Sequence, residues 1–379
     1  MRFDHLKSLY LSGGVFVILL VTGFLLSERK LLWTDELYTQ QAVIDTRSYS
    51  DILTSRTPEG NKNPLFYVMQ KVVSNIYSYH MPVYFSGDFY RTRDIPSQVI
   101  MRIPSNIYMS LALALLFYFF TRFFSILAAV YALSVALVSP MVWMYWAEAR
   151  PYPLWFLLTT VQLVLLCCPF IAPKIKTTNK LFLTHIFLAL TASASIFQIS
   201  IAVLVLWRRG GVSIKKLALI WALPMGIAGA YYFISKVFKI KTYMFFPNLF
   251  DGVMPERLFV YVVYALIAWV LPEKYKRSSN NTFFLPIFFL FFTSVCFLLS
   301  MNLYTKNSDF GFFSRYLIYL APADIMMFSL ASVDLRRWSR QNFWICLNVS
   351  IFLGGLVIVR GLMTYRDILA AATYLHSPS

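Results

Sequence analysis

The sequence predicts an all-α polytopic membrane protein with about ten or eleven transmembrane helices. The chain has 379 residues, of which 59% are hydrophobic and only 13% are charged, and its mean hydropathy is +0.62. A soluble domain of this length carries more charge. Apolar runs close to the roughly 20 residues needed to span a bilayer also recur along the chain, and short charged segments separate them.

The expected spans follow one another from the amino terminus. The first covers residues 10–26 and has no small-residue cleavage site after it, so we interpret it as a retained anchor. Two later runs, 181–194 and 196–207, are short, and they predict either two half-length helices that meet inside the bilayer or one long tilted helix. The remaining runs lie near residues 103–120, 126–146, 154–170, 217–234, 258–271, 282–300, 316–332 and 342–359.

The net charge of +17 follows the expected topology. If the amino terminus is cytoplasmic and the spans alternate, the inner segments hold 16 Lys and Arg but only three acids. This asymmetry is the positive-inside pattern of membrane proteins. The basic balance therefore indicates membrane orientation and no nucleic-acid partner.

One long loop, residues 27–98, is expected on the opposite, non-cytoplasmic face. Its segment "NPLFYVMQKVVSNIYSY" has apolar residues at helical spacing, which predicts an amphipathic helix on the membrane surface. We expect a single membrane domain over residues 1–379, with juxtamembrane helices in the 27–98 loop.

Four polar features share this face. Each has a plain structural interpretation: a solvated loop start, an exposed turn before a helix, an interfacial ion pair, and a snorkelling arginine. Asp324, about nine residues beyond the last feature, is an intramembrane carboxylate that could act in function or cap a backbone break near Pro322. The features are, in chain order, Asp35 with Glu36; Glu59, Lys62 and Asn63; Glu148 with Arg150; and Arg315.

Five short motifs in order resemble those of the GT-C glycosyltransferases, in the protein-mannosyltransferase-like and aminoarabinose-transferase-like branch of bacterial inner-membrane enzymes. The order and spacing of the motifs cover nearly the whole chain. They are "WTDELY", "NPLFYVM", "MRIPS", "EARPYPLWF" and "SRYLIYLAP".

The resemblance implies a transferase that moves a sugar from a polyprenyl-phosphate donor to a lipid, polysaccharide or protein acceptor on the periplasmic face. Asp35 would be the catalytic base, Glu36 a neighbour that holds the loop, and Arg315 the ligand of the donor phosphate. Such a reaction needs a base for the acceptor hydroxyl and a cation for the departing phosphate. The substrate-binding candidates are Glu36, Glu59, Lys62, Arg102, Glu148, Arg150, Tyr152, Arg315 and Tyr316.

No cofactor is assigned with certainty. In some relatives an acid at the position of Glu59 ligates a metal, but Asn63 stands where many have His or a second Pro. A metal-independent inverting reaction is the simplest interpretation, and a divalent metal is the alternative. The tail, residues 360–379, stands in place of the external domain of longer relatives.

A second class of function uses the same charges. A transporter or flippase for a lipid-linked or anionic solute would place them along a permeation path. Transporters commonly contain inverted repeats and broken helices at the midplane, and the sequence shows neither.

Overall fold

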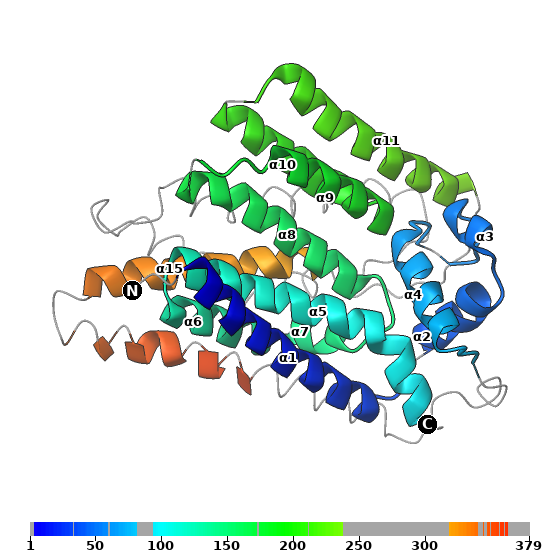
Figure 1. Cartoon of the computed structure of the whole chain (residues 1–379), viewed down its shortest axis with the longest axis horizontal. Helices are drawn as coiled ribbons and strands as arrows, with labels where there is room; N and C mark the ends of the chain where they lie inside the picture. The colour runs from blue at the N-terminus through cyan, green and yellow to red at the C-terminus, as the bar shows by residue number, and fades with distance from the viewer. Residues whose placement is uncertain are drawn as a thin grey trace, which may run out of the picture.

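The computed structural model describes most of the chain as helix (Figure 1). Every regular element in the described residues is a helix. The predicted spans at 258–271 and 282–300 lie outside these residues, and the one at 342–359 lies partly outside them. The described ranges are 4–32, 34–59, 61–81, 94–172, 174–210, 212–237, 318–339 and parts of 344–362.

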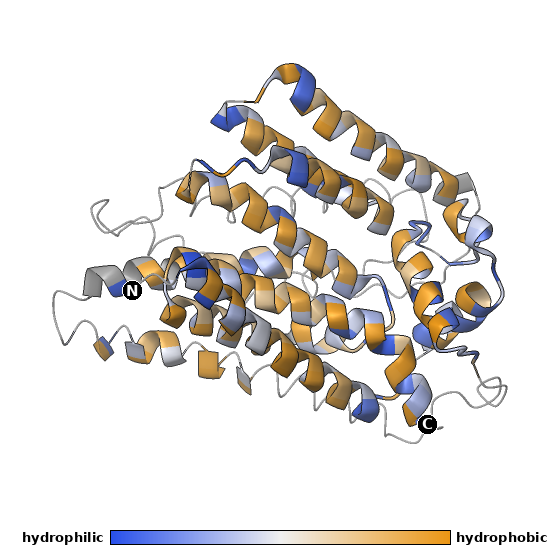
Figure 2. Ribbon diagram, viewed as in Figure 1, coloured by the Kyte–Doolittle hydropathy of each residue, from blue (hydrophilic) through white to orange (hydrophobic). Residues whose placement is uncertain are grey.

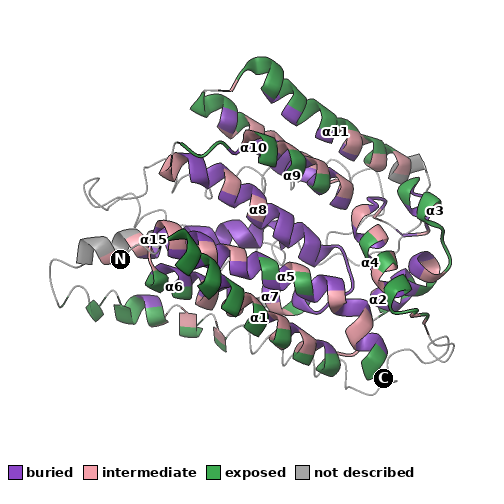
Figure 3. Ribbon diagram, in the orientation of Figure 1, coloured by how far each residue is buried: buried purple, intermediate pink, exposed green. Residues whose placement is uncertain are grey.

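Four of the described helices are long and apolar enough to cross a membrane: α1 (His5–Arg29), α5 (Ile95–Phe123), α8 (Tyr152–Ile171) and α11 (Ile214–Val237). Apolar residues predominate along these helices (Figure 2). Helix α5 packs against both α1 and α8. The central helices α5 and α8 are largely buried, whereas α1 and α11 expose apolar side chains (Figure 3). An exposed apolar surface of this kind is suited to contact lipid.

Glycine allows α1 to approach its neighbours closely. A Cβ atom on Gly23 would lie 2.9 Å from Nε1 of Trp146 and 3.0 Å from Oδ1 of Asn106. On the same side of the interface, Nδ2 of Asn106 donates a hydrogen bond to the Ser27 hydroxyl at 2.8 Å. Helices α1 and α5 therefore meet at a polar contact. Only glycine at position 23 leaves enough room for it.

The predicted continuous span at 126–146 is wrong. The segment forms two helices, α6 (Ile126–Leu137) and α7 (Pro140–Trp146). Proline has no amide hydrogen to continue the first helix, and its fixed φ suits the first turn of the next. The break turns the chain just before the 147–151 segment that carries Glu148 and Arg150.

The segment from 178 to 209 forms two helices, so a single long helix is also wrong. They are α9 (Thr178–Thr191) and α10 (Ser195–Arg209). The side chains of Asn61 and Asn63 donate to the carbonyls of Thr191 and Ala189. The two helices therefore meet beside the segment that precedes α4.

Residues 34–76 fold into short helices at one end of the bundle, and we call this group the cap (Figure 1). Within it, α4 buries Phe66, Tyr67 and Gln70 and exposes Ile76. This pattern agrees with the amphipathic helix expected there, and its placement on a membrane surface stays a prediction. The cap consists of α2 (Thr34–Thr39), the π-helix η1 (Gln40–Asp45), α3 (Tyr49–Leu53) and α4 (Leu65–Ile76).

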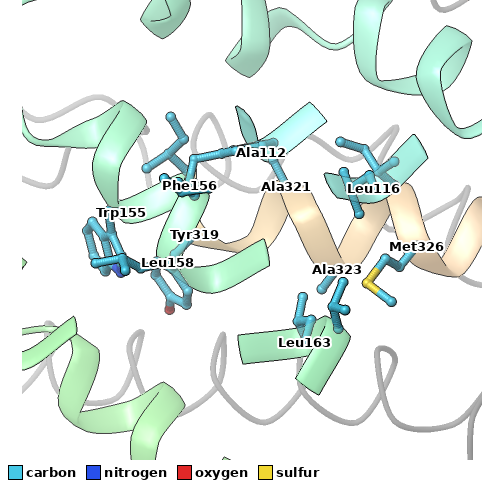
Figure 4. Packing of buried hydrophobic residues seen from close by; sticks show 14 of the residues in the cluster. Ala112, Leu116, Trp155, Phe156, Leu158, Leu163, Tyr319, Ala321, Ala323 and Met326 are labelled. Atoms are coloured by element: carbon cyan, nitrogen blue, oxygen red, sulfur yellow. The ribbon is translucent and has the colours of Figure 1, made fainter. Parts of the chain in front are cut away.

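The apolar core extends to the last described long helix, α15 (Ala321–Ser339), which packs against α6 and α8. Figure 4 shows Ala112 of α5, Phe156 of α8 and Ala321 of α15 in one cluster. The rings of Trp155 and Tyr319 stack with centroids 4.9 Å apart. Tight packing at this end fixes the start of α8, and α8 begins directly after the polar 147–151 segment.

Replacement of Gly23 with alanine tests the close approach of α1. Gly23→Ala should lower the apparent melting temperature of the purified full chain in detergent, since overpacking of this kind costs about 1–3 kcal/mol. Gly14→Ala, in the same helix, meets nothing within 4 Å. It should be neutral or slightly stabilising, because alanine favours helix over glycine. Equal melting shifts in the two variants would contradict the contact.

Candidate functional site

The structure brings most of the predicted site residues together where the cap meets the bundle. Arg315 and Tyr316 lie outside the described residues. Two buried arginines organise the site, each with its own carboxylate partners, and the turn before α8 carries two of the charged residues. The described members are Asp35, Glu36, Glu59, Lys62, Arg102, Glu148, Arg150 and Tyr152.

The first arginine, Arg102, forms a buried ion pair with Glu36. Its Nη2 and Nε atoms donate to the two carboxylate oxygens at 2.6 and 2.8 Å, and both side chains are fully buried. Two parallel bonds between a guanidinium and a carboxylate are strong and directional. The pair therefore fixes α2 on α5.

The same guanidinium also holds the end of α1. It donates to the carbonyls of Ser27, Lys30 and Leu31, at 3.2 Å for Ser27 and 2.8 Å for Leu31. The last carbonyls of a helix have no partner within the helix, so Arg102 satisfies groups that would otherwise be buried without a donor. Glu36 accepts a further bond, at 2.7 Å, from the amide of Ala149.

Burial and the neighbouring charges act in opposite directions on the pKa of Glu36. Burial raises the pKa of this carboxyl, but Arg102, Lys30 and the bond from Ala149 together bring it below its ordinary value of 4.5. The carboxylate is thus the stable form in the folded protein. Glu36 was also predicted to bind substrate. The structure places it, fully buried, where it connects α2 to α5, to the end of α1 through Arg102, and to the turn before α8.

The second arginine, Arg150, binds the acids of the cap. Its Nη1 lies 2.8 Å from Oε1 of Glu59 and donates to the Thr39 hydroxyl and to the carbonyl of Asp35. Thr39 in turn donates to Glu59. Burial lowers the pKa of Arg150, but the neighbouring Glu59, Tyr152 and Tyr67 carry it well above its ordinary range. The site thus holds a permanent positive charge.

Asp35 differs from the other carboxylates in its accessibility. Its side chain is 37% exposed, and Oδ2 lies 3.8 Å from Nη2 of Arg150. Glu36, Glu59 and Glu148 are all buried. Among the described acids of this site, Asp35 is therefore the one that a bound molecule can reach.

The remaining candidates line the inner side of the site. Lys62 is buried and donates its Nζ to the carbonyl of Thr57, and Tyr152 packs its ring against Tyr145 with centroids 5.1 Å apart. Burial lowers the pKa of Lys30, while the charge of Glu148 opposes this shift. These buried side chains contribute to the electrostatic environment of the two arginines, and little of their surface is accessible to a ligand.

Sequence reasoning missed three members of the site. Lys30 donates to the carbonyl of Met144 at 2.6 Å, and Thr39 bridges Arg150 and Glu59. Tyr67 is the third: burial and the charge of Glu59 raise its pKa, and the charge of Arg150 opposes this shift. The position of Thr39, one turn after Asp35 on the same helix, was a usable signal. The other two depend on contacts between distant segments.

The surroundings of Glu59 do not fit a metal centre. Its carboxylate accepts from Arg150 and Thr39, and a cation bound there would face the guanidinium charge. Among the described residues, no group of three His, Cys, Asp or Glu side chains could hold an ion. We therefore derive no step that involves a metal.

The geometry offers one accessible carboxylate beside a buried, permanently charged guanidinium. Such a pair can accept a proton from a hydroxyl and orient the group that carries it. Comparisons with protein-family models, with curated proteins and with solved structures found no match to this chain.

The Glu36–Arg102 pair can be tested by a double-mutant cycle. Arg102→Met leaves a buried carboxylate unpaired and should destabilise the protein by about 3–5 kcal/mol. The double variant Arg102→Met/Glu36→Leu should lose less than the sum of the single losses. Chemical denaturation of the full chain measures each value, with Arg29→Met as the exposed control. Additive losses would show that the two side chains are not coupled.

The lowered pKa of Glu36 predicts a pH dependence of stability. The contribution of the ionised group is complete above the unfolded pKa, near 4.5, and is lost as the pH falls through the lower folded value. The melting temperatures of wild type and Glu36→Gln should therefore converge below pH about 4.5. Arg29→Met, on the exposed end of α1, removes no group that titrates in this pH range and should keep a constant offset. A pH-independent gap between wild type and Glu36→Gln would refute the assignment.

Proposed function

We propose that this protein is a membrane glycosyltransferase of the GT-C type. It would transfer a sugar from a polyprenyl-phosphate donor to a lipid, polysaccharide or protein acceptor. The proposal includes a bundle of about ten or eleven transmembrane helices in the bacterial inner membrane and a site that faces the periplasm. Its support is the set of five motifs in order, together with the meeting of charged residues from three of them, "WTDELY", "MRIPS" and "EARPYPLWF", at one end of a bundle in which four of the described helices are long enough to span a membrane.

The observation that carries the proposal is the accessibility of Asp35 beside Arg150. Its Oδ2 lies 3.8 Å from the guanidinium, which also binds the carbonyl of the same residue. A carboxylate held in this way is positioned to receive a proton and remains open to a substrate. The neighbouring acids are buried.

The reaction would proceed by direct displacement. Asp35 takes the proton of the acceptor hydroxyl while that oxygen forms a bond to the anomeric carbon of the donor. The bond from that carbon to the phosphate oxygen breaks, and the polyprenyl phosphate leaves with the electron pair. The configuration at the anomeric carbon is inverted. A cation beside the leaving phosphate would stabilise its developing charge, and Arg315 is the candidate from the sequence.

A transporter that places the charged residues along a permeation path would also need polar groups along a path through the bundle. Gln162 donates to His185 and to the carbonyl of Gln198, and Trp155 donates to the side chain of Gln198. These buried groups hydrogen-bond to one another and tie α8 to α9 and α10, so their arrangement suits helix packing. Net movement of solute into liposomes without a covalent product would favour transport.

Substitution of Asp35 tests the proposed reaction. Purified full chain should consume at least one member of a panel of polyprenyl-phosphate sugars, with the product detected by mass. Asp35→Asn should reduce transfer by about 10²-fold or more, the usual contribution of a general base. Its melting temperature should stay close to that of wild type, because the side chain is partly exposed.

The matched control is Asp51→Asn. Asp51 lies in the same cap, where it forms a capping box with Ser48 at the start of α3, and its loss should leave transfer intact. Full transfer by Asp35→Asn would remove Asp35 from the mechanism. If wild type consumes no donor in the panel, the transferase function is rejected.

A further inference from the structure

One side of the short helix α2 carries exposed side chains at the edge of the site. Asp35 and Tyr38 are three residues apart and so lie side by side on the helix surface. Tyr38 is 46% exposed, and the Asp35 side chain is 37% exposed. Glu36 and Leu37, on the other side of the helix, are buried, and so is Thr39, which follows Asp35 by one turn. We call the exposed pair the α2 face.

Tyr38 belongs to the site and is more than a solvated surface residue. Burial of part of the phenol and the negative charge of Glu59 raise its pKa, while Arg47 opposes the shift. Because Glu59 also binds Arg150 at 2.8 Å, the ring stands within electrostatic reach of the same acid that holds the guanidinium. The α2 face borders the charged interior of the site, because the carboxylate of Asp35 lies 3.8 Å from the guanidinium of Arg150.

The chemistry of the α2 face excludes two kinds of occupant. A lipid chain would cover the Asp35 carboxylate and remove it from water without compensation. A phosphate would meet the carboxylates of Asp35 and Glu59, and the nearby guanidinium of Arg150 already contacts both. A neutral polyol with one apolar surface meets neither objection.

We propose that the α2 face binds a sugar ring. The ring of Tyr38 would pack against the C–H face of the sugar, since the negative face of an aromatic ring attracts polarised hydrogen atoms. Asp35 would accept a hydrogen bond from a sugar hydroxyl, and an ionised carboxylate has the spare acceptor capacity to do so beside Arg150. The assignment of this sugar to a substrate rests on the proposed function, but its binding does not.

The binding test uses methyl α-glycosides of glucose, mannose and galactose as probes. Saturation-transfer NMR on the full chain in detergent should show transfer to the ring protons of at least one glycoside. Tyr38→Leu should weaken that binding about two- to tenfold, the usual value of one aromatic contact. Tyr38→Phe keeps the ring and should bind normally. Tyr77→Leu, an exposed tyrosine at the end of α4, is the matched control.

A kinetic test identifies the source of the sugar. In Tyr38→Leu, the KM of either the polyprenyl-phosphate sugar or the acceptor should rise by a similar factor, with kcat changed less. A rise confined to the donor assigns the face to the donor sugar, and a rise confined to the acceptor assigns it to the acceptor. Both results support the inference.

Two results would overturn it. One is the absence of saturation transfer to every glycoside with wild-type protein. The other is equal affinity and equal KM values in Tyr38→Leu and Tyr77→Leu. If glycosides bind in a Tyr38-dependent way but no sugar is transferred from any donor, the transferase function fails and the sugar-binding face remains. If sugar is transferred but neither binding nor transfer depends on Tyr38, the transferase function stands and the sugar-binding face is rejected.

Discussion

The buried ion pair between Glu36 and Arg102 is the constraint on which the rest of the site depends. Its guanidinium, which is carried by α5, binds both the end of α1 and the start of the cap. Its carboxylate reaches the turn before α8 through the amide of Ala149. Removal of two charges from water costs several kcal/mol for each ion. Close geometry and full hydrogen bonding must offset that cost, so the four segments can meet in very few ways.

This constraint explains why two acids stand next to each other after the first helix. Neighbouring residues on a helix point about 100° apart, so when Glu36 turns inward to Arg102, Asp35 must turn toward the opening. Arg150, which Glu59 and Thr39 hold in place, then lies beside Asp35. The position of the accessible carboxylate is therefore set by its buried neighbour.

The apolar runs of the sequence predicted the four long helices of the described residues, and the charged motifs predicted that one end of the bundle is polar. Both predictions follow from local sequence pattern. Pro140 marked the break at α7, but the length of the apolar run concealed it. The role of Arg102 could not be predicted, since its partner lies 66 positions away in the chain and "MRIPS" contains no sign of an acid. Contacts made by backbone groups, such as the amide of Ala149, leave no signature in residue type.

Burial also decides which acid at this site can take up a proton. Protonation of Glu36 would leave the charge of Arg102 without its partner in a low-dielectric interior, where such a charge is expensive. A proton on Asp35 has no comparable effect, because water reaches its side chain and the charge of Arg150 is still balanced by Glu59. A base must be protonated once in each catalytic cycle. Of the adjacent pair, only Asp35 can meet that demand without disturbing the contacts that hold the site together.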